Sequence, residues 1–131
     1  MRKLVISGSL SLENKIKYWV KYFDDLNYEV LNYPKKFSSE YFLENYSDIY
    51  KDFLVSISNS DILFVMNEDK NGIKGYIGAA SYAELCFAIS QNLLYDKKIE
   101  IYLYQRPGTQ VQCYNEIAMW LNLGKVKIWN K

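Results

Sequence analysis

The chain of 131 residues contains no histidine, and this absence excludes several kinds of active site. Ser-His-Asp and Cys-His nucleophile arrangements need an imidazole, and so do metal sites built on histidine. Any general acid or base must therefore be a carboxylate, a tyrosine, a cysteine or a lysine. The two cysteines, Cys86 and Cys113, have neither the spacing of a metal site nor that of a disulfide framework, so we interpret them as free core thiols.

A strong net charge and a long apolar run are also missing. The formal net charge is +1, which provides no electrostatic footprint for nucleic acid or for an anionic membrane. No apolar run approaches the length of a membrane span, and the first apolar run, residues 1–6, is too short for the core of a signal peptide. We therefore expect a cytoplasmic protein with no nucleic-acid and no membrane partner.

Hydrophobic residues make up 50% of the chain, which predicts one folded domain over residues 1–131 with its own core. Short apolar segments at residues 3–6, 29–33, 61–66, 98–104 and 126–129 alternate with segments of helical period. Residues 61–66 are apolar on both faces, as is typical of a central strand in a parallel sheet. We predict an α/β fold with an open parallel sheet of five strands, order 2-1-3-4-5, and helices on both faces.

The helices between these strands have recognisable starts and ends. Ser9 or Ser11 is the expected cap of the first helix, and Ser38 or Ser39 that of the second. The second helix has aromatic and aliphatic residues at helical spacing from Phe42 to Ile57, which predicts one long helix from Ser39. Tyrosine is abundant at thirteen residues, which are expected in the core or in interfaces, and some of them could stack on a planar ligand. The last helix is expected over residues 110–121, with Gly124 at its C-terminal cap.

Glu84 is the main catalytic candidate. It is the only Asp, Glu, Lys or Arg between Lys74 and Asp96, within a helix that follows the third strand. A buried carboxylate is costly unless it is paired, protonated or used. Ligands of open parallel sheets bind beyond the carboxyl ends of the strands, where this helix begins. A structural carboxylate, bonded to a neighbouring N–H or tyrosine hydroxyl, is the alternative interpretation.

Other polar residues are expected at the same edge of the sheet. The residues after the first strand offer hydroxyls and backbone N–H groups that suit a phosphate or a sugar hydroxyl, although an ordinary strand-to-helix turn looks the same. Asp69 is a candidate second catalytic carboxylate, and Arg106 is either an anion contact or a surface arginine. The expected substrate-binding residues are Ser7, Gly8, Ser9, Ser11, Asn67, Tyr76, Gly78, Ser81 and Arg106.

Three segments carry a resemblance to a known family: residues 5–11 (VISGSLS), 60–67 (SDILFVMN), and 69–78 (DKNGIKGYIG) followed by the helix with Glu84. Through them the chain resembles the nucleoside 2-deoxyribosyltransferase-like family, and within it an uncharacterised bacterial branch. The resemblance implies a flavodoxin-like or Rossmann-like fold, a homo-oligomer and a nucleoside or nucleotide substrate. It also implies that Glu84 attacks the anomeric carbon of a 2-deoxyribosyl group without a metal or a cofactor.

The sequence departs from the family pattern at identifiable positions. The transferases carry an aspartate six residues before the glutamate, where Gly78 stands, and another where Phe53 stands, next to Asp52. Three hypotheses follow. The protein cleaves or transfers at the N-glycosidic bond of a 2′-deoxynucleoside or its 5′-monophosphate; or it is a non-catalytic nucleotide- or nucleoside-binding module; or it acts through a glutamate on another ribosyl ligand such as NAD.

Overall fold

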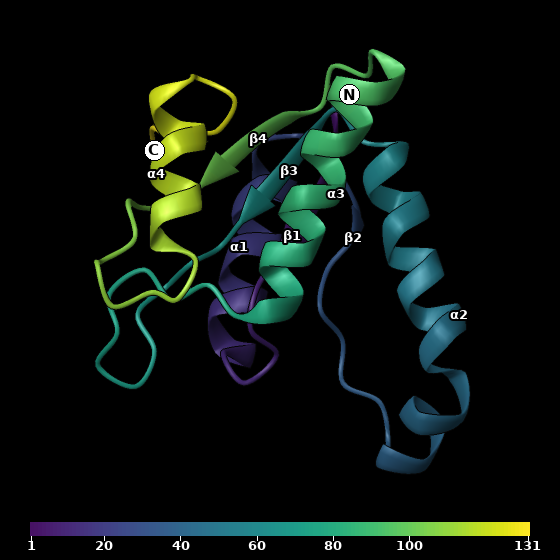
Figure 1. Cartoon of the computed structure of the whole chain (residues 1–131). Coiled ribbons are helices and arrows are strands. Elements are labelled where there is room, and N and C mark those ends of the chain that lie inside the picture. The colour runs from purple at the N-terminus through teal and green to yellow at the C-terminus, as the bar shows by residue number, and fades with distance from the viewer.

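Five parallel strands in the order β2-β1-β3-β4-β5 form the sheet of the computed structural model, which describes residues 1–131 (Figure 1). The strands are β1 (Lys3–Ser7), β2 (Glu29–Asn32), β3 (Ile62–Val65), β4 (Glu100–Leu103) and β5 (Lys127–Ile128). The helices are α1 (Glu13–Asp25), α2 (Ser39–Ser58), α3 (Ala79–Tyr95) and α4 (Tyr114–Asn122). All four neighbouring pairs are parallel, so the predicted fold class and strand order are confirmed. The arrangement is that of flavodoxin-like and Rossmann-like sheets.

Helices cover both faces of the sheet, as predicted. Helix α1 lies on one face, where the packed side chains are Leu4, Ile6, Ile16, Trp19, Phe23, Ile62, Phe64 and Met66. Helices α2, α3 and α4 contribute to a second core cluster on the other face, through Ile57, Leu85 and Ile117. All four residues of β3 are buried because the strand has neighbours on both sides and helices on both faces. No helix is both long and apolar enough to cross a membrane.

The helix ends confirm some of the expected caps and correct others. Ser38 caps α2, since its hydroxyl accepts a hydrogen bond from the Tyr41 N–H at 3.2 Å. The serine cap predicted for α1 is wrong: the residue at the cap is Leu12, and the Ser9 and Ser11 hydroxyls bond each other at 3.0 Å. Helix α4 begins at residue 114 because the preceding residues form successive turns, and Gly124 closes its end with φ +73°.

Helix α2 is longer than the sheet needs, and its N-terminal part extends past the edge of the sheet (Figure 1). Ile57 is its only fully buried residue, and Phe42 and Tyr46 keep 38% and 55% of their surface exposed. The long helix predicted from the spacing of Phe42 to Ile57 is confirmed, but only the C-terminal end of this stripe is packed in the core. Asn45 departs from helical geometry with φ −116° and ψ 15°, which marks a kink in the overhanging part.

Candidate functional site

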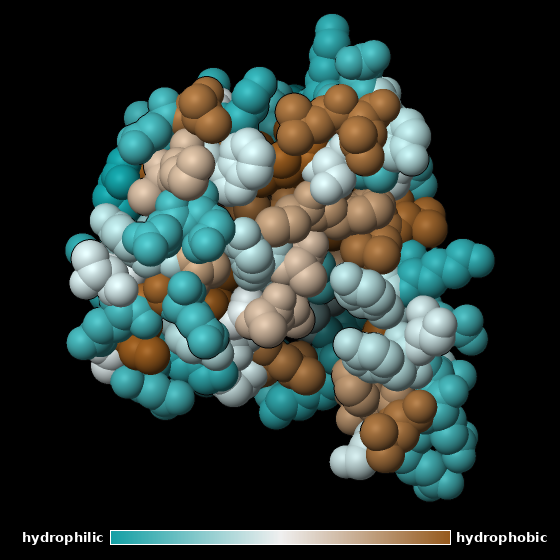
Figure 2. All heavy atoms as spheres, in the orientation of Figure 1, coloured by the Kyte–Doolittle hydropathy of each residue, from teal (hydrophilic) through white to brown (hydrophobic).

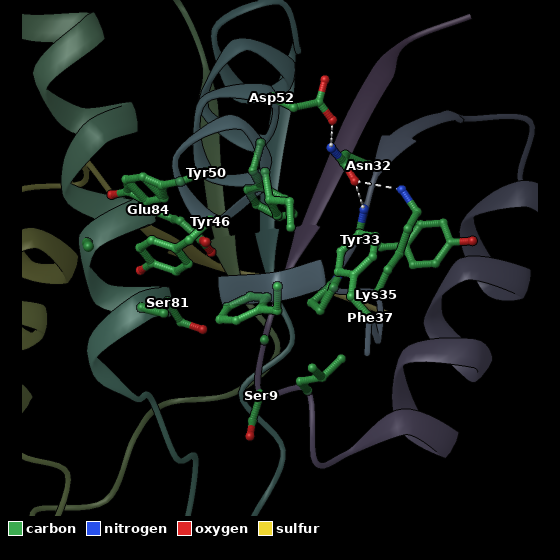
Figure 3. A pocket seen from close by; sticks show the side chains of 18 of the residues that line it. Ser9, Asn32, Tyr33, Lys35, Phe37, Tyr46, Tyr50, Asp52, Ser81 and Glu84 are labelled. Atoms are coloured by element: carbon green, nitrogen blue, oxygen red, sulfur yellow. Dashed lines mark hydrogen bonds between the residues drawn. The ribbon is translucent and has the colours of Figure 1, made fainter. Parts of the chain in front are cut away.

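A pocket of about 910 Å³ lies between α2, α3 and the carboxyl ends of β1 and β2. Its walls come from the loop after β1, the segment after β2, the overhanging part of α2 and the first turns of α3 (Figure 3). In the space-filling view the overhanging end of α2, at lower right, stands away from the body of the molecule (Figure 2). The pocket is therefore at the switch in strand order, because β1 pairs with β2 on one side and β3 on the other.

Glu84 reaches this pocket from the second turn of α3 (Figure 3). Gly78 precedes the helix in an extended conformation, and the helix starts at the sheet edge where β1 ends. The Ser7 hydroxyl, fully buried at the end of β1, donates a hydrogen bond of 2.6 Å to Glu84 Oε1. The second carboxylate oxygen has no hydrogen-bond partner within the protein, so one oxygen is held and the other is free.

Burial raises the pKa of Glu84 from its ordinary value of 4.5 to about 7, against the opposite effect of the Ser7 hydrogen bond. No lysine or arginine forms an ion pair with this carboxylate. Near neutral pH both protonation states are therefore populated. A carboxylate that is more basic than usual and faces a pocket is suited to act as a nucleophile or as a general acid or base.

Aromatic side chains form a large part of the pocket wall. They come from the segment after β2 and from α2: Tyr33, Phe37, Tyr41, Phe42, Tyr46, Tyr50 and Phe53. The Tyr46 and Tyr50 rings are nearly parallel, with an interplanar angle of 5° and centroids 6.2 Å apart. Flat apolar faces with polar tips suit a planar ligand that also forms hydrogen bonds. The helical spacing from Phe42 to Phe53 predicted that these residues share one side of a helix, and the abundance of tyrosine was a sequence signal for stacking on a planar ligand.

Asn32 organises a polar group at another part of the wall (Figure 3). Its amide donates to Asp52 Oδ2 at 3.3 Å and to Ser56 Oγ at 3.1 Å. Its carbonyl oxygen accepts from the Tyr33 N–H and from Lys35 Nζ, both at 2.9 Å. Asn32 is buried and fully used, so it holds the ionisable side chains of Asp52 and Lys35 at the pocket surface. Asn32 and Lys35 were not among the residues expected from the sequence.

Several residues expected at the site do line the pocket. Gly8, Ser9, Tyr76, Gly78 and Ser81 are all part of its wall, and Ser7 contacts it through Glu84. Gly8 is required by packing: a Cβ at this position would lie 2.6 Å from Met66 Cγ, so any side chain would push the loop away from the core. Gly78 and Phe53, where the sequence departs from the pattern of the family that it resembles, both line the pocket.

Asn67 and Asp69, which follow β3 directly, do not line the pocket. Asn67 is buried, and its amide donates to the carbonyls of Gly75 and Gln105 at 3.3 and 2.7 Å. Asp69, expected as a second catalytic carboxylate, accepts from the Gly75 N–H at 2.9 Å and from the Gln105 side chain at 2.8 Å. These two bonds hold the pKa of Asp69 below its usual value. Both side chains connect loops through these hydrogen bonds, and neither lines the pocket.

Ser11 and Arg106 are exposed and lie outside the pocket wall. Arg106 belongs to the loop after β4, on the side of β3 away from β1, and its side chain makes no ion pair. The surface interpretation of this arginine therefore agrees with its position.

No protein-family model matches the chain, and no curated protein matches it. The site is consequently interpreted from its own geometry together with the motifs of residues 5–11, 60–67 and 69–78.

Proposed function

We propose that this protein is an enzyme that cleaves or transfers at the N-glycosidic bond of a 2′-deoxynucleoside or its 5′-monophosphate, with Glu84 as nucleophile. The observation that carries the proposal is the state of the Glu84 carboxylate. One of its oxygens is held by Ser7, the other is free, and the group faces a pocket with an extensive aromatic wall. The resemblance of residues 69–78 and the following helix to deoxyribosyltransferases supports the same assignment.

The proposed reaction has two steps. The free Glu84 oxygen forms a bond to the anomeric carbon while the carbon–nitrogen bond breaks, and the base leaves with that electron pair and takes up a proton from solvent water. Positive charge that develops on the sugar is stabilised by the nearby carboxylate. Water or a second base then attacks the anomeric carbon and gives up a proton to the solvent, the ester bond to Glu84 breaks, and the carboxylate is restored.

The rest of the pocket supports the same assignment. The Tyr46 and Tyr50 rings on α2 provide stacking surfaces for a base, and Ser9 and Ser81 provide hydroxyls near the end of β1 and the start of α3 for the sugar. We also propose that the protein is cytoplasmic and forms a homo-oligomer. The overhanging part of α2 supports the oligomer, because Leu43 is 78% exposed there and Phe42 and Tyr46 are also exposed.

The test is base release from the common 2′-deoxynucleosides and their 5′-monophosphates, measured for the wild type and for Glu84→Gln. The variant keeps the volume and can still accept from Ser7, but it loses the charge and most of the nucleophilicity. We expect base release to fall by orders of magnitude, and a deoxyribosyl ester on the Glu84 peptide of the wild type would identify the intermediate by mass. Glu116→Gln, an exposed carboxylate of α4 outside the pocket, is the matched control. Equal base release by wild type and Glu84→Gln would contradict the assignment.

A non-catalytic nucleotide- or nucleoside-binding module is the second candidate. The specific observation in its favour is that Gly78 and Phe53 line the pocket where the transferases have aspartates. This function predicts that nucleosides or nucleotides bind to the wild type and to Glu84→Gln with no release of base by either protein.

A further inference from the structure

Lys70 stands at the edge of the pocket on a short, well-defined hairpin. Its N–H donates to the Ile73 carbonyl at 3.1 Å, and its carbonyl accepts from the Ile73 N–H at 2.9 Å. The two residues between them, Asn71 and Gly72, have φ values of 52° and 74°. Positive φ at both central positions is the pattern of a type I′ turn, for which Asn-Gly is a preferred sequence. The hairpin therefore gives the Lys70 backbone a fixed position.

The Lys70 side chain is directed to the pocket wall. Its ammonium group donates to Ser9 Oγ at 2.9 Å and lies 4.8 Å from the centroid of the Tyr76 ring. Both of these residues line the pocket. The hydrogen bond to Ser9 uses one of the three N–H donors of the ammonium group. The neighbouring Asp69 is bonded to Gly75 and Gln105 instead, and Lys70 has no carboxylate partner anywhere in the chain. Its positive charge is consequently available to a ligand.

The loop after β1 adds further donors beside this charge. Because an ammonium group only donates, Ser9 Oγ must accept from Lys70, and its own proton is directed to Ser11 Oγ at 3.0 Å or to a ligand. The backbone N–H groups of residues 8–11 donate to no acceptor in the protein. One ammonium group, serine hydroxyls and free N–H groups together present donors with no carboxylate among them. Such a set is complementary to a phosphate group.

The position of this set relative to Glu84 determines which part of a substrate it meets. Ser7, the last residue of β1, holds the Glu84 carboxylate, and Ser9 follows two residues later in the loop after β1. The aromatic lining residues come from the segment after β2 and from α2. With the anomeric carbon at Glu84 and the base along α2, the remaining part of the sugar meets the loop. We infer that the substrate carries a phosphate ester on its sugar and that Lys70 is the residue that selects it. This inference rests on the proposed function and deepens it, since that function left the nucleoside and its monophosphate as alternatives.

The experiment compares kcat/KM for base release from each 2′-deoxynucleoside and from its 5′-monophosphate, in the wild type, Lys70→Met, Lys70→Arg and Lys74→Met. Lys74→Met is the matched control, an exposed lysine of the same loop that lies outside the pocket wall. We expect the wild type to prefer the monophosphate by about tenfold or more, as for a charge-assisted hydrogen bond. Lys70→Met should lose most of this preference, Lys70→Arg should keep part of it, and Lys74→Met should keep it fully. Higher salt should also reduce the preference in the wild type.

The inference would be overturned if the wild-type kcat/KM for the monophosphate were close to that for the nucleoside, or if Lys70→Met left the ratio of the two unchanged. Base release would still support the proposed function in either case. If no variant releases base, the inference is decided by binding alone. Calorimetric titration of Glu84→Gln with a deoxynucleoside monophosphate should then give tighter binding than the matching nucleoside, and adding Lys70→Met should remove the difference. Equal binding of the two ligands, or no effect of Lys70→Met, would overturn it in that case too.

Discussion

Two regions at the carboxyl edge of the sheet contain similar residues and have opposite uses. Where β1 ends, Ser7 and Glu84 meet at a pocket, and one carboxylate oxygen stays free. Where β3 and β4 end, the polar atoms of Asn67 and Asp69 form hydrogen bonds with Gly75 and Gln105. The difference comes from topology. Strands β3 and β4 are consecutive in the chain and adjacent in the sheet, so the loops that follow them pack on each other. The strand order reverses at β1, because its neighbours β2 and β3 lie on opposite sides of it, and the crevice forms at this reversal.

Replacing the carboxylate of each region by its amide tests the comparison most strongly. We expect Glu84→Gln to lower base release by a factor on the order of 10³ or more, as for the loss of a nucleophile. Asp69→Asn should lower it by less than about tenfold, since its two hydrogen bonds act only on loop positions. Steady-state kinetics on both variants measures the ratio, and similar losses would mean that both regions take part in the chemistry.

Substitutions should lower the free energy of unfolding more in the loop region of Asn67 than in the pocket region. Asn67→Ala leaves the Gly75 and Gln105 carbonyls of a buried loop pair without their side-chain donor, so we expect a loss of about 2–3 kcal/mol in the free energy of unfolding. Urea denaturation measures this loss. Ser81→Ala, at a buried polar residue of the pocket region, is the comparison, and it should lose less because the Ser81 hydroxyl makes no hydrogen bond within the protein. A smaller loss for Asn67→Ala than for Ser81→Ala would break the comparison.

The contributions of Glu84 and Asp69 to the stability of the fold should depend on pH with opposite sign. Burial raises the pKa of Glu84 to about 7 in the folded protein, so its stabilising contribution is present below the unfolded pKa near 4.5 and is lost as pH rises through about 7. Glu84→Gln removes this dependence. Because Glu84 is partly exposed, we expect the variant to gain only about 1–2 kcal/mol over the wild type at pH 8.5, and less at pH 5.

For Asp69 the folded pKa is lowered, so its contribution is present above the unfolded pKa and is lost as pH falls through the folded value. Thermal melts of the wild type, Glu84→Gln and Asp69→Asn from pH 3 to pH 9 separate the two effects. If Glu84 is the nucleophile, base release should rise with pH through about 7, because the ionised form attacks. A flat stability difference for Glu84→Gln across this range would contradict the raised pKa.

The sequence predicted the elements better than it predicted their surroundings. The apolar run of residues 61–66 identified the central strand, because a strand buried on both faces cannot alternate with polar residues. Glu84 was identified by its isolation in an apolar helix, and the helix does bring it to the pocket. The predictions of a serine cap for α1 and of a start of α4 at residue 110 were wrong. The Ser9 and Ser11 hydroxyls bond each other, and residues 108–113 form turns instead of helix.

The aromatic wall shows why a periodic pattern is insufficient. Residues Phe42, Tyr46 and Phe53 have the spacing of a core stripe, and the stripe becomes a pocket wall because α2 is longer than the sheet that it covers. Local periodicity states which side chains share a helix face, but it does not state where the sheet beneath that face ends.

By itself, the sequence determined the α/β class and the helix that carries Glu84, because these depend on local patterns of burial along the chain. The strand order was predicted from general rules for such sheets and is confirmed by the strand pairing. Only the tertiary structure decided that Ser7 holds Glu84, that Asn67 and Asp69 bind loops, and that Lys70 reaches Ser9. Each of these contacts joins residues from separate loops or elements. Their distances are set by how the strands pair and how the loops pack, which no local pattern contains.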